Sequence, residues 1–342
     1  MKKIKKIPVL CFLILILASS PVFSFELEDL QDAVDDFSAA MAQSLPFNST
    51  VGLNWSDAYI GQLLNAPPHF GVGLSAGFTT IKIDAFNSLM KYFEYQIPLN
   101  IPIGFPLPAY TIEARIGGLF LPFDIGVKFG YLDTSKMSLF EPFGVNIDYL
   151  LIGADIRYAL IDSKLLPLKL SVGAGFNHLK GGISTTIKDS GTNYSFIAPD
   201  TLGGQSYSIS ISDLDLGFLW QTNVLELKTH VSFPLFIITP YAGVGASYSW
   251  STAGYKVKSD VTAYKNGTII PINNDLKKIL DGFGVSNVSD DGFESMIEVS
   301  DWNVRVYGGI SFNLAVVKLD LTVMYNIRDS AFGGTFGIRF QL

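Results

Sequence analysis

Histidine is the side chain that most often serves in acid–base catalysis near neutral pH, and this sequence contains only three, His69, His178 and His230. A catalytic histidine needs a Ser or Asp partner placed beside it. We expect His69 and His230 to lie near the ends of extended segments, and all three histidines to have interior or interface roles. The histidines therefore do not indicate an enzyme.

Metal and phosphate chemistry has equally little support in the sequence. The only cysteine, Cys11, lies in a segment that we expect to be removed, so the mature chain has no thiol for a disulfide, a zinc site or a nucleophile. The acidic stretch 290–294 lacks the regular spacing of a calcium loop, and we interpret it as a solvated turn. The Gly-x-Gly pairs at Gly71, Gly173 and Gly243 do not open helices, which argues against a phosphate loop. We expect no metal and no cofactor.

The composition is poor in charge and rich in apolar residues. Charged residues make up 16% of the 342 residues and hydrophobic residues 48%, whereas a soluble domain carries about 25% charged residues. Disorder and nucleic-acid binding both require more charge and fewer aromatic residues, so neither is a suitable first interpretation.

The first 24 residues predict a secretory signal peptide. Four lysines within positions 2–6 precede an apolar run at 9–18, and small residues precede a cleavage site after Ser24. Too little apolar sequence precedes Cys11 for the alternative, a lipid anchor at that residue. Removal of four of the 24 basic residues leaves 20 against 31 acidic ones, a net charge of −11, which argues against an anionic partner at the outside of the molecule.

The rest of the chain alternates apolar residues with small or polar ones. No uninterrupted apolar run approaches the ~20 residues that a spanning helix needs. The one other architecture that satisfies every backbone group in lipid is a closed barrel of alternating strands. A soluble β-sandwich also alternates, but its polar face usually carries more Lys, Glu and Thr than these Gly- and Ser-rich positions. The fold class that we predict is therefore all-β, a transmembrane antiparallel β-barrel. The segments that alternate most regularly are 150–160, 168–176, 302–314, 317–328 and 336–342.

Turn lengths predict about ten strands within a barrel domain at 69–342. Short and long connections follow one another in turn, as they do where short periplasmic turns oppose long outer loops. Twelve or fourteen strands stay open, because 207–212 and 255–263 also alternate and could lengthen strands or form a further hairpin. The expected strands are 69–81, 110–119, 123–133, 144–161, 167–179, 214–232, 238–252, 300–313, 316–328 and 333–342.

The inward positions of these strands carry an excess of positive charge. Four acids, Glu113, Asp155, Glu226 and Asp320, face nine basic residues, which leaves a lumen excess of +5. Unpaired charges in a narrow, partly dehydrated lumen are costly. The predicted lumen-lining cations are Arg115, Lys128, Arg157, Lys169, Lys228, Arg305, Lys318, Arg328 and Arg339.

The segment 25–68 does not fit the barrel pattern. Leu27, Leu30, Val34, Phe37 and Met41 recur at helical spacing, opposite an acidic face. We expect a helical plug whose acids neutralise the lumen. The alternatives are a periplasmic helix lying against the barrel end, with solvent and small ions in a wet lumen. The predicted plug acids are Glu28, Asp29, Asp32, Asp35 and Asp36.

The C-terminal residues Phe336, Ile338, Phe340 and Leu342 resemble the last strand of bacterial outer-membrane β-barrels, although such strands usually end in an aromatic residue. This resemblance implies the outer membrane of a diderm bacterium, with its lipid and the barrel-assembly machinery as partners. The N-terminal plug and the apolar outer loops loosely resemble the long-chain fatty-acid transporter family, but that family's Asn-Pro-Ala turn is absent and its barrel has fourteen strands in a longer chain. In that family hydrophobic ligands bind an apolar outer groove, enter the lumen and leave sideways into the membrane.

The first outer loop is the expected ligand surface. A helical apolar stripe is followed by a Pro-rich extended stretch, and exposed apolar surface of this kind usually marks a binding site. The alternative is a lid that buries the same residues against other loops. We predict a channel or transporter for hydrophobic small molecules, with a narrow polar porin-like channel, or a structural or surface-interaction barrel acting through its outer loops, as alternatives. The tentative ligand-binding residues are Phe86, Met90, Phe93, Ile101, Ile103 and Phe105.

Overall fold

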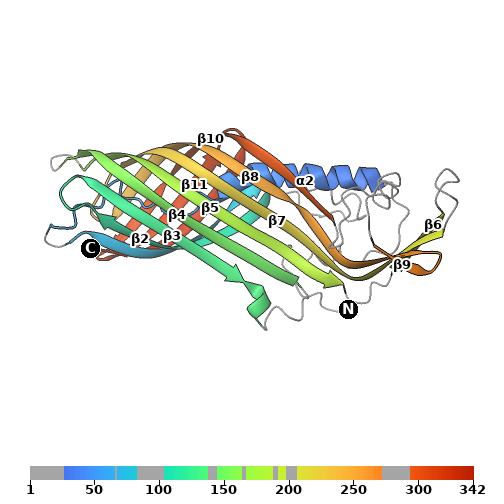
Figure 1. Ribbon diagram of the computed structural model, residues 1–342. Coiled ribbons are helices and arrows are strands. Elements are labelled where there is room, and N and C mark those ends of the chain that lie inside the picture. Colours follow the sequence, from blue (N-terminus) through green and yellow to red (C-terminus); the bar gives the residue numbers. More distant parts are fainter. Residues whose placement is uncertain are drawn as a thin grey trace, which may run out of the picture.

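The computed structural model describes residues 27–65, 68–82, 104–137, 145–163, 167–187, 192–197, 206–271 and 293–342. Most of these residues belong to β-strands of one antiparallel sheet (Figure 1). The strands are β1 (Phe70–Ile81), β2 (Phe105–Gly117), β3 (Phe123–Asp133), β4 (Val145–Asp162), β5 (Lys169–Ile187), β6 (Thr192–Ile197), β7 (Ser206–Ser232), β8 (Ile238–Lys265), β9 (Thr268–Ile270), β10 (Phe293–Leu314), β11 (Val317–Asn326) and β12 (Ala331–Gln341).

Ten of these strands close into a barrel, as the alternation predicts. The first and last strands pair from Gly71 with Gln341 to Thr79 with Gly333, and this pairing closes the sheet. The β7–β8 pairing completes the ring on the other side. The short strands β6 and β9 pair with β7 and β8 above the barrel and are not part of its wall.

The wall has an apolar outside and a polar inside. On β4, for example, Ile152, Ile156 and Leu160 are exposed outward, while Leu151, Asp155 and Arg157 between them are buried inward. The same alternation continues around the ring, so a band of apolar side chains surrounds the barrel. Such a band belongs to a barrel that crosses a membrane with strands. No helix among the described residues is long and apolar enough to cross a membrane.

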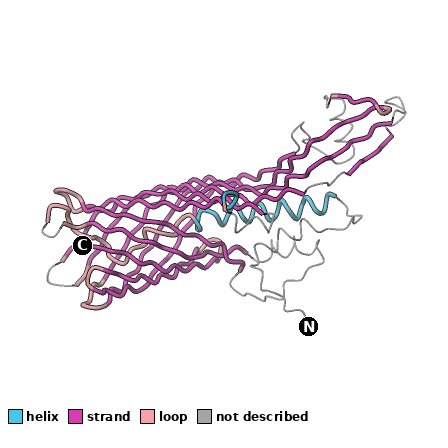
Figure 2. The backbone as a smooth tube through the Cα atoms, turned by 90° about the horizontal axis from the view of Figure 1, so that it is seen from below, coloured by secondary structure: helices cyan, strands magenta, loops and turns pink. Residues whose placement is uncertain are grey.

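The two ends of the barrel differ. One end, here called the short-turn end, carries the tight connections at 118–122, 233–237 and 315–316, and both His69 and the C-terminal Leu342 lie there. At the other end, here called the long-loop end, β7 and β8 reach 27 and 28 residues and project far past the barrel (Figure 2). A spanning strand needs only about 9–11 residues, so more than half of each strand lies outside the band.

The N-terminal helix α2 (Leu27–Asn48) begins outside the long-loop end and enters the barrel mouth (Figure 2). Its last turns bury Met41, Ala42 and Leu45. The helix lies against β8, β10, β7 and β1, whose residues surround the mouth. Pro46 in the final turn cannot donate a backbone hydrogen bond, and the helix ends two residues later.

Candidate functional site

The segment that follows α2 runs through the barrel from the long-loop end to the short-turn end. Toward the long-loop end, the Asn48 side chain donates to Thr79 Oγ1 at 2.9 Å and to the Leu107 carbonyl at 3.0 Å. Toward the short-turn end, the Ile60 amide donates to Asp124 at 3.2 Å, and the Leu63 amide donates to the carbonyl of Gly118 in a short turn at 3.0 Å. Residues 48–60, here called the lumen segment, are therefore threaded through the barrel.

Side chains of β2 and β3 hold the upper part of the lumen segment. The Glu113 carboxylate accepts hydrogen bonds from the Leu53 amide at 2.9 Å and from the Trp55 indole at 2.6 Å. The Lys128 ammonium donates to the carbonyls of Ser49 and Val51 at 2.7 and 2.8 Å. Backbone groups of the lumen segment, together with the Trp55 indole, thus satisfy a buried acid and a buried base that face each other across two paired strands.

One position of the lumen segment requires glycine. Gly52 has φ +86°, in the left-handed region that side chains disfavour, and a Cβ there would lie 2.4 Å from Thr111 Oγ1. The next residue, Leu53, also has a positive φ, of 58°. This tight reversal brings the Leu53 amide to Glu113.

A buried ionic network joins the barrel strands on the short-turn side of Glu113 and Lys128. Arg115 contacts Asp124 at 2.5 Å and Asp155 at 2.6 Å. Arg157 contacts the same Asp124 at 2.8 Å, and Lys228 contacts Asp155 at 2.6 Å. Arg115 and Asp124 have no exposed side-chain surface, so their charges depend on each other for stabilisation. Arg157 also donates to the Asp57 carbonyl at 2.7 Å, which ties the network to the lumen segment.

A second ionic group is centred on Asp57 of the lumen segment. Its carboxylate lies 2.6 Å from Lys318 Nζ and 2.9 Å from an Arg339 nitrogen. Arg339 also faces Asp320 at 3.2 Å and donates to Ser56 Oγ at 2.7 Å. The lumen segment therefore supplies one of the acids that compensate the barrel cations.

Two further contacts fix the lumen segment on the β7, β8 and β10 side. Arg305 pairs with Glu226 at 2.6 Å and donates to Asn54 Oδ1 at 3.1 Å. His230 lies 3.1 Å from the Ser56 carbonyl and 3.1 Å from the Tyr307 hydroxyl, and no described acidic residue is among its hydrogen-bond partners. His230 therefore holds the lumen segment in place and does not form a catalytic pair among the described residues.

An apolar cluster lies inside the long-loop end of the lumen. Met41, Ala42 and Leu45 of α2 pack against buried, inward-facing residues of the wall, and Phe37 lies 5.2 Å from Phe218 between ring centroids. We call this region the apolar layer. Its wall residues are Ile81, Leu151, Leu179 and Ala253, with Leu107, Tyr149, Phe218, Trp220 and Val299 partly buried around them.

Most of the predicted lumen cations meet the partners described above. Lys169, for instance, donates to the Tyr59 carbonyl at 3.0 Å. Arg328 differs from the expectation, because the chain turns after Asn326 and places Arg328 half-exposed beside Asp301 and outside the lumen. The cations with lumen partners are Arg115, Lys128, Arg157, Lys169, Lys228, Arg305, Lys318 and Arg339.

The acids that sequence reasoning missed are Asp57 and Asp124. Asp124 shares the inward parity of Lys128 on β3, so a complete count along that strand would have found it. Among the predicted plug acids, Asp36 is exposed and Asp35 accepts a hydrogen bond from Ser295 at 3.4 Å in the long-loop half. The side chains of Glu28, Asp29 and Asp32 lie outside the described residues.

Most of the predicted ligand-binding loop also lies outside the described residues. This applies to Phe86, Met90, Phe93, Ile101 and Ile103, whose role stays a prediction. Phe105 is described: it is the first residue of β2, half-buried, and pairs with Ile81 of the apolar layer.

Neither a protein-family model nor a curated protein matches the chain. Solved structures with similar folds are bacterial outer-membrane barrels. They include the attachment invasion locus protein Ail of Yersinia pestis (9% identity, TM-score 0.27, covering 80% of this chain and 97% of that one) and the toluene transporter TbuX of Ralstonia pickettii (12%, 0.23, 80% and 88%). The translocator domain of the autotransporter NalP from Neisseria meningitidis is a third (10%, 0.32, 92% and 98%).

Proposed function

We propose that this chain is a non-enzymatic outer-membrane β-barrel that binds hydrophobic small molecules at its long-loop end, above the filled lumen, and passes them into the membrane. The observation that supports the proposal is the apolar layer. Where α2 meets the wall, the inward face carries leucine, isoleucine, alanine and aromatic residues, with the hydrogen-bonded pair Thr222 and Ser251 among them. The proposal places the short-turn end in the periplasm and the long-loop end at the cell surface, because periplasmic turns are short and outer loops are long.

The helix α2 and the lumen segment differ in what holds them. The lumen segment is fixed by ion pairs and by hydrogen bonds from at least four wall cations, which makes it a stable floor. The described contacts of α2 in the apolar layer are made without ion pairs. The helix also meets polar wall residues through Gln43, beside Asn303 and Asp329, and through Asp35, which accepts a hydrogen bond from Ser295. Since α2 enters from outside and is attached to the floor at its C-terminal end, a hydrophobic molecule can replace it at the wall without breaking the ion pairs below.

A narrow polar channel fits the described lumen less well. The cross-section that contains Arg115, Asp155 and Arg157 is filled by their ion pairs and by the lumen segment. Conduction of polar solutes would require this buried network to separate, which is costly in a dehydrated site. We therefore favour an apolar ligand that enters at the long-loop end.

A second function has one specific observation in its favour. Above the membrane band, β6, β7, β8 and β9 form a projecting sheet (Figures 1 and 2). A strand of 27 residues spans about 90 Å at ~3.3 Å per residue, far more than the wall requires. This sheet is suited to a surface-interaction role, which a ligand-binding barrel can also carry.

The proposal can be tested with one pair of matched variants. Trp220 packs inward over Gly181 in the apolar layer, whereas Trp302 is exposed on the outward face. Loss of one large buried apolar contact is worth about 1.5–3 kcal/mol. The variant Trp220→Ser should therefore weaken binding of a fluorescent long-chain fatty acid by about 10- to 100-fold.

The control Trp302→Ser should leave the affinity unchanged. Equal affinities for the two variants, or absence of binding to the unmodified protein, would overturn the proposal. In that case the surface-interaction function would lead.

A further inference from the structure

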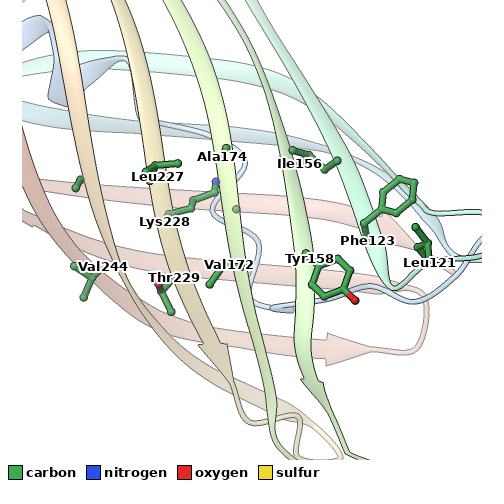
Figure 3. Close-up of a pocket in the computed structure, with 12 residues that line it drawn as sticks. Leu121, Phe123, Ile156, Tyr158, Val172, Ala174, Leu227, Lys228, Thr229 and Val244 are labelled. Atoms are coloured by element: carbon green, nitrogen blue, oxygen red, sulfur yellow. The ribbon is translucent and has the colours of Figure 1, made fainter.

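A hollow of about 880 Å³ lies in the outward, membrane-facing wall of the barrel, well away from the lumen (Figure 3). Side chains from β4, β5, β7 and β8 line it, together with Phe123, the first residue of β3, and Leu121 in the turn before it. Its volume is in the range of small-molecule pockets, about 300–1,000 Å³. Lys228 is among its residues, but its ammonium group pairs with Asp155 inside the barrel. We call the hollow the wall groove.

The sequence explains why a hollow forms on a surface that should be convex. Several outward positions around the hollow carry small side chains: Ala174 on β5, Thr229 on β7 and Ala246 on β8. The two alanines flank Leu227 in one row of paired strands, and Thr229 lies in the next row between Val172 and Val244. Larger side chains stand beside them: Tyr158 on β4 and Phe123 on β3 form one flank. Small residues between large ones leave a depression where a uniform wall would bulge.

The wall groove lies in the half of the membrane band nearest the short-turn end. The pair Val172–Thr229 is only three residue pairs above the end of the β5–β7 ladder at Lys169–Ser232. Toward the long-loop end, the next outward pair of the ladder is Phe176–Leu225, whose side chains are exposed and do not line the groove. Below it, the turn 233–237 is apolar, and its Phe236 is 97% exposed. The groove and this turn therefore form one continuous apolar surface at the periplasmic side of the band.

We propose that the wall groove is a binding site for a phospholipid of the periplasmic leaflet, with one acyl chain lying on its floor. The surface is continuous with the membrane band, so the molecules that reach it are lipid chains. Among the lining side chains only Tyr158 and Thr229 carry polar atoms that are not turned into the lumen, which suits a hydrocarbon chain. A second copy of the barrel would present a broad convex wall that does not fill such a hollow.

The site differs from annular lipid contact elsewhere on the barrel. At many other outward positions of the wall, large apolar side chains stand exposed, among them Ile112, Val127 and Phe129. Lipid chains on such a surface exchange freely because contact is made on one side only. In the wall groove the chain is contacted from the floor and from the flank of Tyr158 and Phe123. The bound lipid should therefore remain through detergent extraction.

Filling the groove provides the test, and the barrel offers a matched control. The double variant Ala174→Leu/Ala246→Leu fills the floor. The control Ala76→Leu/Ala114→Leu makes the same change at outward alanines of β1 and β2, outside the groove. Each full-length mature protein is reconstituted in phosphatidylethanolamine vesicles, extracted in detergent and analysed by native mass spectrometry. Correct assembly is checked by the resistance of the folded barrel to sodium dodecyl sulfate. If the double variant does not assemble, Ala174→Leu alone carries the test.

We expect the unmodified protein and the control to retain phosphatidylethanolamine, and the groove variant to lose it. Equal retention by all three proteins would overturn the proposal, and so would the absence of retained lipid on the unmodified protein. A dimer that disappears in the groove variant would assign the groove to a second copy and would also overturn it. The fatty-acid binding of the apolar layer is independent of each result, because the groove lies on the other side of the wall.

Discussion

Removal of the Asp57 carboxylate should loosen the lumen segment while the barrel wall stays closed. Asp57 lies 2.6 Å from Lys318 and 2.9 Å from Arg339, and its side chain is 7% exposed. In an Asp57→Asn variant Arg339 keeps Asp320 at 3.2 Å, but Lys318 loses the acid that faces it. Removing one partner of a buried ion pair typically costs about 3–5 kcal/mol. We expect the lower value, because Lys318 is 14% exposed and water can reach it.

A cost of about 3 kcal/mol should increase the population with a displaced lumen segment about 100-fold. A cysteine at Ala58, which has no exposed surface, would measure this population by its rate of maleimide labelling. We predict that signal cleavage removes Cys11, so the introduced thiol would be the only one. Labelling of Ala58→Cys should be about 100-fold faster with Asp57→Asn than without it.

The matched control is Asp133→Asn, because Asp133 pairs with Lys136 at 2.7 Å on an exposed turn outside the lumen. That change should leave the labelling rate at Ala58→Cys as it is. If Asp57→Asn also left the rate unchanged in a correctly assembled barrel, Asp57 would not hold the lumen segment, and the reasoning from buried charge would be refuted.

Two further predictions concern the path of the chain. A short epitope placed before Leu27 should bind antibody on intact cells, because α2 enters the barrel from the long-loop end, and an epitope at Asn266 should do the same. If the epitope before Leu27 were detected only after the outer membrane is opened, the chain would enter the barrel from the periplasmic side and the prediction would be wrong. The variant Gly52→Ala should lower the stability of the lumen segment by about 1–3 kcal/mol, because alanine is strained at φ +86° and its Cβ would meet Thr111. Faster labelling of Ala58→Cys would measure that effect, and an unchanged rate would contradict it.

The barrel could be predicted from the sequence because a spanning strand imposes a strict period of two over about ten residues. Strand ends were harder. The expected second strand begins at 110, whereas β2 begins at Phe105 and includes Pro106 and Pro108. Prolines are tolerated there because that part of β2 pairs with β1, while the pairing with β3 begins only at Ile112, so a missing N–H costs no ladder bond. Residues 207–212 and 255–263 lengthen β7 and β8, which was one of the two alternatives left open.

The lumen was harder to predict than the wall. The parity of the strands placed the cations inward, but the neutralising acids are Asp57 and the barrel's own carboxylates, among them Asp124. A periodic signal identifies the side of a strand on which a residue lies. It does not reveal that backbone carbonyls of an irregular segment accept hydrogen bonds from Lys128 and Arg157. Such contacts depend on the threaded path, which leaves no period in the sequence.

In the proposed mechanism a hydrophobic molecule replaces α2 at the apolar layer, while the lumen segment below it stays in place. The most direct test is the maleimide labelling rate of Ala42→Cys, in the apolar layer, with and without a saturating long-chain fatty acid. Neither Ala42 nor Ala58 has exposed surface in the structure. We expect the fatty acid to speed labelling of Ala42→Cys and to leave the labelling rate of Ala58→Cys unchanged. Bound fatty acid with unchanged or slower labelling of Ala42→Cys would contradict this mechanism.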